Sequence, residues 1–235
     1  MEVQISVQKI NKYASRESGD TVEVIERPGG GISIVVADGQ SSGIGAKRIS
    51  NMVARKVVSL LAEGVRDGAA ARAASDYLFA EKHGKVSATL NIISVDKQTS
   101  SLVITRNNPA PVFAVNKEEI LCLEEESIPV GLYRSTRPVI SEIPLQAGLI
   151  VVVFTDGLVH AGSRSGRSID IRNAIAEIQT DDDISAEMLC GKLLSAAVQL
   201  DEHRPVDDTS IAVIGVFSAP EKDNIRKMSI KLPLD

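Results

Sequence analysis

The order of strand-like and helix-like segments limits the fold of this chain more than any other feature of its sequence. Strand patterns come first, two helical patterns follow, and then come further strands, two more helices and a last strand. A doubly wound parallel sheet would need strands and helices in alternation, which this order lacks. The order predicts an α+β fold, a four-layer α-β-β-α sandwich of two antiparallel sheets flanked by helix pairs.

The spacing of apolar residues assigns the individual elements. Strands are predicted at residues 3–10, 21–26, 32–37, 87–95, 100–106, 111–116, 119–123, 138–145, 149–155 and 210–217. Helices are predicted at residues 45–63, 69–82, 168–178 and 185–200. No Pro/Gly/Ser-rich linker interrupts the chain, so we expect one domain over residues 1–235. Its core would span about 3–217, followed by a tail at 218–235 in which residues 224–232 are a candidate edge strand.

Composition narrows the classes of function. Hydrophobic residues make up 43% of the chain, which is enough for a substantial core, whereas aromatic residues make up only 3%. The net charge of −5 and the lack of an evident basic cluster argue against nucleic-acid binding, which needs a positive surface. No apolar run is long enough to cross a membrane. Cys122 and Cys190 lie in no metal-ligand spacing, so we expect buried free thiols in a cytoplasmic protein.

Aspartates recur where an apolar strand ends or in turns of small residues. Asp20 follows Ser-Gly, Asp38 and Asp156 each end an apolar run and precede glycine, and Asp207 and Asp208 precede the last strand. A single Asp-Gly is an ordinary turn, but a strand that stops at Asp places a carboxylate at a sheet edge. Several such edges together can hold hard divalent cations. Two such ions, about 3.5–4 Å apart, activate water and clamp a phosphoryl group, so the pattern predicts a metal-dependent phosphatase.

The aspartates lie in short blocks that resemble those of the PPM (PP2C-type) protein serine/threonine phosphatases, most of all the bacterial SpoIIE, RsbU and RsbX branch. The resemblance spans roughly residues 10–217 and keeps the order of the branch. Its blocks are Ser18-Gly19-Asp20, Ala37-Asp38-Gly39, Asn107-Asn108-Pro109, Pro129-Val130-Gly131, Phe154-Thr155-Asp156-Gly157-Leu158 and Asp207-Asp208-Thr209. In length the chain is most similar to RsbX, a stand-alone phosphatase of the stressosome.

The resemblance implies two Mn²⁺ or Mg²⁺ ions as cofactors. Asp38 would bridge the two ions, and the carbonyl of Gly39 would bind one of them. Asp156 and Asp207 would complete the coordination of the second metal, and Asp20 would hold metal-bound waters. A water activated by the ions would then attack phosphate without a covalent enzyme intermediate.

Some nearby residues have two possible roles, and others depart from the family pattern. Arg16, four residues before Asp20, is either a phosphate-binding residue or a solvated loop arginine. Gln40 stands where animal members carry a histidine, and an amide cannot act as a general acid. Ser41 replaces an expected glycine. His160 replaces a frequent glutamate and is either a metal ligand or an ordinary surface or helix-start histidine.

The family also implies a substrate class. We expect hydrolysis of phosphoserine and phosphothreonine on signalling proteins, with phosphorylated STAS-domain scaffold proteins of a stressosome-type complex as the substrates. The alternative is a catalytically weak module with a phosphatase fold that binds a signalling partner. A haloacid-dehalogenase-type phosphatase is disfavoured because neither Asp38 nor Asp156 lies in the Asp-x-Asp pattern that it needs.

Overall fold

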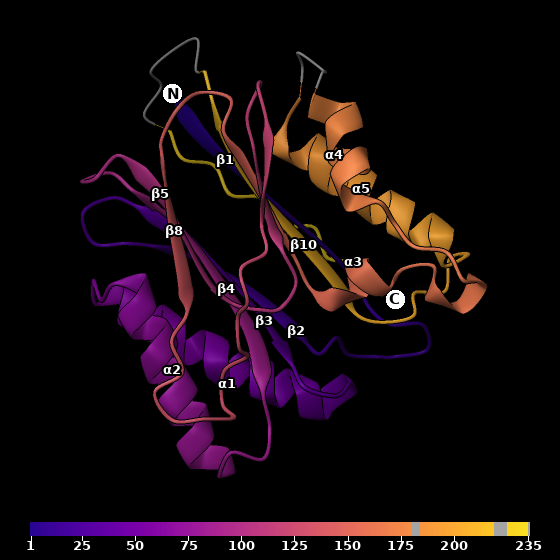
Figure 1. Cartoon of the computed structure of the whole chain (residues 1–235), viewed down its shortest axis with the longest axis horizontal. Helices are drawn as coiled ribbons and strands as arrows, with labels where there is room; N and C mark the ends of the chain where they lie inside the picture. Colours follow the sequence, from indigo (N-terminus) through magenta and orange to yellow (C-terminus); the bar gives the residue numbers. More distant parts are fainter. Residues whose placement is uncertain (180–183, 219–224, 235) are drawn as a thin grey trace.

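A computed structural model describes residues 1–179, 184–218 and 225–234, and it confirms the predicted α+β sandwich (Figure 1). One sheet, called here the β10 sheet, has the order β1 (Glu2–Ile10), β10 (Thr209–Phe217), β9 (Ile150–Phe154), β6 (Val112–Val115) and β7 (Ile120–Leu123). The other, called the β3 sheet, has the order β2 (Asp20–Glu26), β3 (Ile32–Gly39), β4 (Ala88–Asp96), β5 (Ser101–Asn107) and β8 (Val139–Pro144). All neighbouring strands in both sheets are antiparallel.

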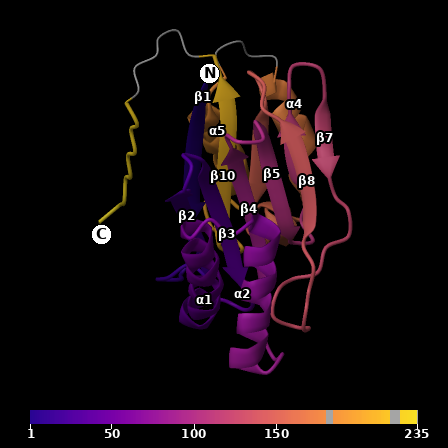
Figure 2. The same ribbon diagram turned by 90° about the vertical axis from the view of Figure 1, so that its left-hand side faces the viewer.

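Two long helices cover each outer face. Figures 1 and 2 show α1 (Gly43–Ala62) and α2 (Asp67–Lys82) on the β3 sheet, with α4 (Ile171–Gln179) and α5 (Ala186–Leu200) on the far side of the β10 sheet. Two shorter elements, α3 (Asp156–His160) and the 3₁₀ turn Ser163–Ser165, follow β9. No helix within the described ranges is both long and apolar enough to cross a bilayer.

Three aliphatic clusters hold the layers together. Between the sheets, Ile34 and Val36 of β3 pack in one cluster with Val151 and Val153 of β9. Alternation along each strand sends these residues inward and their neighbours toward the helices. Outside the β3 sheet, alanines of α2 share a cluster with valines of α1, and small side chains let the two helices approach closely.

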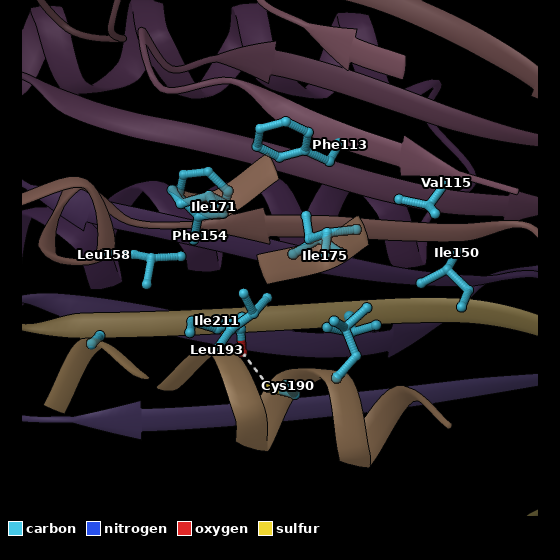
Figure 3. Packing of buried hydrophobic residues seen from close by; sticks show 14 of the residues in the cluster. Phe113, Val115, Ile150, Phe154, Leu158, Ile171, Ile175, Cys190, Leu193 and Ile211 are labelled. Carbon is cyan, nitrogen blue, oxygen red and sulfur yellow. Dashed lines mark hydrogen bonds between the residues drawn. The ribbon is translucent and has the colours of Figure 1, made fainter. Parts of the chain in front are cut away.

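The third cluster lies under α4 and α5 (Figure 3). Phe113 and Phe154 stack there with their ring centroids 6.2 Å apart. The thiol of Cys190 is buried and donates a hydrogen bond to the carbonyl of Ile211, at 3.4 Å. Both cysteines are free, as predicted, but Cys122 on β7 is only half-buried, because an edge strand covers its side chains less than a central one.

Two expectations from the sequence are wrong, and one short helix escaped prediction. Residues 225–234 form no strand, because their backbone pairs with no sheet edge and their side chains are exposed; residues 219–224 and 235 lie outside the described residues. The chain does have a basic cluster, since Lys82 of α2 lies beside three cations spaced along α1, namely Arg48, Arg55 and Lys56. The five-residue helix α3 is too short to show a helical period.

Candidate metal centre

One strand pair from each sheet brings all four predicted aspartates to a single pocket. The pocket lies where β2 begins and β3 ends, facing the end of β9 and the start of β10. Its volume is about 240 Å³. It is lined by Asp20, Asp38, Gly39, Gln40, Ser41, Ser87, Ala88, Thr89, Pro129, Asp156, Asp207 and Asp208.

The register of the β3 sheet sets the first two carboxylates side by side. Asp20 and Asp38 are direct cross-strand partners in the β2–β3 pair. Like charges in that arrangement destabilise a sheet unless positive charge lies between them. Asp20 is only 1% exposed, so water cannot supply that compensation. The pair therefore needs either a proton on one carboxyl group or a cation between the two carboxylates.

Asp20 is held from the opposite sheet. Its Oδ2 accepts hydrogen bonds from the hydroxyls of Ser210, at 2.6 Å, and Thr155, at 2.9 Å. Its Oδ1 is buried and has no hydrogen-bond partner among the described residues. A buried carboxylate oxygen without a partner is costly, and a bound cation or an ordered water would satisfy it.

Two lysines fix the backbone at the same point. Lys9 of β1 and Lys47 of α1 each donate a hydrogen bond to the carbonyl oxygen of Asp20, at 2.9 Å and 2.6 Å. The pKa of Lys9 is lowered by burial and by the charge of Lys47. These contacts place positive charge behind the acidic pocket and attach α1 directly to the backbone of one of its aspartates.

The other side of the pocket is more open. Asp156 begins α3, His160 ends it and Asp207 lies in the loop before β10; one ligand atom from each lies within 4.8 Å of the others. The Nδ1 atom of His160 is 4.0 Å from Oδ2 of Asp156. The structure thus brings His160 beside the aspartates at the end of a helix, and not at a helix start.

Burial and the neighbouring charges raise the pKa values of three aspartates in the pocket. Burial, together with the charges of Asp20 and Asp156, raises the pKa of Asp38 to about 9. Burial also raises the pKa of Asp20 to about 6, and burial with the charge of Asp207 raises that of Asp156. A divalent cation between these groups would reverse the balance by favouring the ionised forms. Four carboxylates, with one imidazole at the edge, fit a hard cation such as Mg²⁺ or Mn²⁺.

The two Asp-Gly glycines serve close backbone packing. A Cβ atom on Gly39 would lie 2.0 Å from the carbonyl oxygen of Ala46 in the first turn of α1. A Cβ atom on Gly157 would lie 2.1 Å from the carbonyl oxygen of Asp208. Each glycine lets a strand end meet a neighbouring segment at the pocket, a packing reason that the sequence alone did not reveal.

The loop after β3 contains two of the departures from the family pattern, Gln40 and Ser41. Ser41 adopts φ +87°, the left-handed conformation that a glycine would take without strain. The side-chain oxygen of Gln40 accepts a hydrogen bond from the backbone N–H of Ser87 at 2.9 Å. Gln40 therefore ties the loop to the approach of β4 and has no acidic proton to offer a leaving group.

The remaining predicted residues have different places. Arg16 is exposed and does not line the pocket, so its phosphate-binding role stays a prediction. Asp208 accepts hydrogen bonds from the backbone N–H groups of Lys12, at 2.9 Å, and Gly19, at 2.8 Å, and so holds the loop before Asp20. Asn108 caps its own turn through the N–H of Ala110 and shapes the fold outside the pocket.

Sequence reasoning missed the residues that hold Asp20. Thr155 lies within one aspartate block and Ser210 directly follows another, so their position beside an aspartate was the available signal. Lys9 and Lys47 had no such signal, because nothing local connects them with Asp20.

Several solved structures similar to this chain contain phosphatase domains. The PP2C domain of Bacillus subtilis SpoIIE matches with a TM-score of 0.80 at 16% identity, over 93% of this chain and 64% of that one. RsbX in complex with magnesium matches with a TM-score of 0.68 at 15% identity, over 91% and 94%. The catalytic domain of the serine/threonine phosphatase PstP, from Mycobacterium tuberculosis, with two manganese ions matches with a TM-score of 0.68 at 14% identity, over 92% and 99%.

The fold is therefore that of a PP2C-type phosphatase domain. The sequence profile of the stage II sporulation protein E (SpoIIE) family matches residues 28–217. The chain belongs to the SpoIIE family, and this homology supports a metal-dependent protein phosphatase. No curated protein matches the chain. The chain spans 64% of the SpoIIE chain with which it superimposes.

Proposed function

We propose that this protein is a metal-dependent protein phosphatase that hydrolyses phosphoserine and phosphothreonine in signalling proteins. The convergence of four carboxylates from two sheets on one pocket carries the proposal. The buried oxygen of Asp20 that lacks a hydrogen-bond partner among the described residues adds a specific place for a ligand. Membership of the SpoIIE family supports the same activity.

The proposal assigns two Mn²⁺ or Mg²⁺ ions to the pocket. Asp38 would be the ligand common to both ions, the Gly39 carbonyl would hold one of them, Asp156 and Asp207 would hold the second, and Asp20 would hold metal-bound waters. When bound, the ions supply a nucleophilic water near neutral pH and positive charge for the phosphoryl group.

The other residues of the pocket position these ligands. The hydroxyls of Ser210 and Thr155 keep one oxygen of Asp20 engaged, so the other oxygen stays directed away from them. Gln40 remains bound to the backbone of Ser87 and takes no part in proton transfer. Arg16, exposed on the loop before Asp20, is kept in the proposal as the residue that binds substrate phosphate.

We further propose STAS-domain scaffold proteins of a stressosome-type complex as the phosphorylated substrates. The resemblance to RsbX, whose fold this chain shares, supports this choice. A cytoplasmic location is part of the proposal and accords with the free thiols of Cys122 and Cys190.

Phosphate release tests the activity and the substrate separately. Purified protein is given phosphoserine peptides and phosphorylated STAS-domain proteins, with Mn²⁺, with Mg²⁺ or with EDTA. We expect metal-dependent release that Asp38→Asn abolishes and that Asp170→Asn, a change of an exposed aspartate outside the pocket, leaves intact.

Turnover of peptides without turnover of STAS-domain proteins would reject the substrate and keep the activity. Metal binding without turnover of either would favour the binding module. Full turnover in EDTA would overturn the metal-dependent mechanism.

A further inference from the structure

A second depression lies on the outer helices and is positively charged. It has a volume of about 660 Å³ and runs between α1 and α2, with no residue in common with the acidic pocket. We call it the basic groove and define it by six of its lining residues: Arg48, Met52, Arg55, Lys56, Tyr77 and Lys82. A chain with a net charge of −5 thus concentrates four cations in one place.

These cations are available to a ligand. Within the described ranges, no ion pair involves Arg48, Arg55, Lys56 or Lys82, and no carboxylate lines the groove. Lys56 lies over the ring of Tyr77, with Nζ 5.7 Å from the ring centroid. Positive charge left unpaired beside more positive charge is unfavourable, so an anionic partner would stabilise the groove.

The arrangement of the cations favours an extended ligand. Arg48, Met52, Arg55 and Lys56 have the spacing of one helix face, and the rise over the eight steps from Arg48 to Lys56 is about 12 Å along α1. A single phosphate ion is too small to meet cations spread over that length. An extended peptide advances about 3.3 Å per residue, so about four residues would span the same distance.

Two apolar side chains in the groove favour a peptide that carries an apolar residue. Met52 and Tyr77 add apolar surface between the cations, which suits one large apolar side chain of a partner. Nucleic acid fits less well, because Tyr77 already lies against Lys56 and is less available to stack on a base.

From this charge complementarity we propose that the basic groove docks an acidic segment of a partner protein, with several carboxylates around one large apolar residue. The carboxylates pair with the guanidinium groups of Arg48 and Arg55 and with the ammonium groups of Lys56 and Lys82. The apolar residue packs on Met52 and Tyr77. Docking there does not depend on the proposed phosphatase activity, because the groove and the acidic pocket share no residues.

The test measures binding of a fluorescent nine-residue peptide with four glutamates around a central leucine. We expect Arg55→Glu/Lys56→Glu to weaken binding at least tenfold. Lys97→Glu/Lys192→Glu, which reverses the same amount of charge at exposed positions outside the groove, should change it less than threefold. Replacing the glutamates by glutamine, or the leucine by serine, should each weaken binding to the wild type.

Several results would overturn the proposal. These are no binding to the wild type at about 100 μM peptide, an equal loss in both double variants, or displacement of the peptide by single-stranded RNA at lower concentration than by unlabelled peptide. Thermal unfolding and hydrolysis of an aryl phosphate should stay unchanged in both double variants, which excludes misfolding as the cause of lost binding.

Discussion

The two sides of the acidic pocket differ in how firmly they are built. On the closed side, Asp20 and Asp38 are cross-strand partners in the β3 sheet, and Asp20 is 1% exposed. On the open side, the side chains of Asp156, His160 and Asp207 are 47%, 55% and 34% exposed. One side is part of the folded core, whereas the other lies on a five-residue helix and a loop.

The closed side supplies ligands whose positions are set by folding, and the open side supplies ligands that can adjust. Folding alone sets the backbone positions of Asp20 and Asp38 through strand register, and buried hydrogen bonds also hold the side chain of Asp20 before any ion binds. The open side has fewer restraints, so its ligands can adjust to the ion and the substrate. Substitutions on the closed side should therefore have the larger effects, and the predictions below test that expectation.

The largest effect is expected for Asp38→Asn. Loss of the central carboxylate should lower kcat by about 10³-fold or more, beyond the roughly 10–100-fold typical of residues that only support a ligand. Phosphate release at saturating Mn²⁺ measures it, and circular dichroism confirms the fold. Near-normal turnover of this variant would mean that the closed side does not hold the ions.

The same substitution should change the stability of protein stripped of metal. The pKa of Asp38 is raised to about 9, above its value in the unfolded chain, so this group stabilises the fold fully only below about pH 4. That contribution is lost as the pH rises toward 9. The melting temperature of the wild type in EDTA should therefore fall as the pH rises from about 4 to 9. The melting temperature of Asp38→Asn should fall less steeply over the same range. Parallel curves would contradict the assignment.

A smaller effect is expected for the hydroxyls that hold Asp20. Ser210→Ala removes the 2.6 Å hydrogen bond to Oδ2, and the metal concentration at half-maximal activity should rise about 10–100-fold. Calorimetric titration with Mn²⁺ measures the same loss of metal affinity without any need for turnover. Ser210→Thr keeps the hydroxyl and should retain most of the affinity. Equal losses in both variants would point to packing and not to the hydrogen bond.

The smallest effect is expected on the open side. His160→Gln should weaken Mn²⁺ binding only about threefold, because its side chain is half-exposed and its Nδ1 lies 4.0 Å from Asp156. The titration used for Ser210 measures this too. A loss as large as that of Asp38→Asn would remove the distinction between the two sides and make the imidazole a principal ligand.

Much of this protein could be predicted from sequence because the relevant signals are local. Two strands can be predicted directly, one from the apolar run Ile32 to Ala37 and one from the alternation in residues 3–10. Asp38 and Asp156 could be predicted as site residues because each lies at or just after the end of an apolar run. The tail could not be predicted in this way. Its apolar residues alternate as in a strand, yet Ile230 is 92% exposed, because a strand also needs an edge with which to pair.

The sequence by itself therefore determined the order of the elements, the aliphatic core and the four aspartates, since each depends on residues close together in the chain. Only the tertiary structure decided that Asp20 faces Asp38 and that Ser210, 190 residues away, holds it. Tertiary structure likewise brought Lys82 to the face of α1 that carries Arg48. Strand register and helix packing set such contacts, and both are properties of the assembled layers.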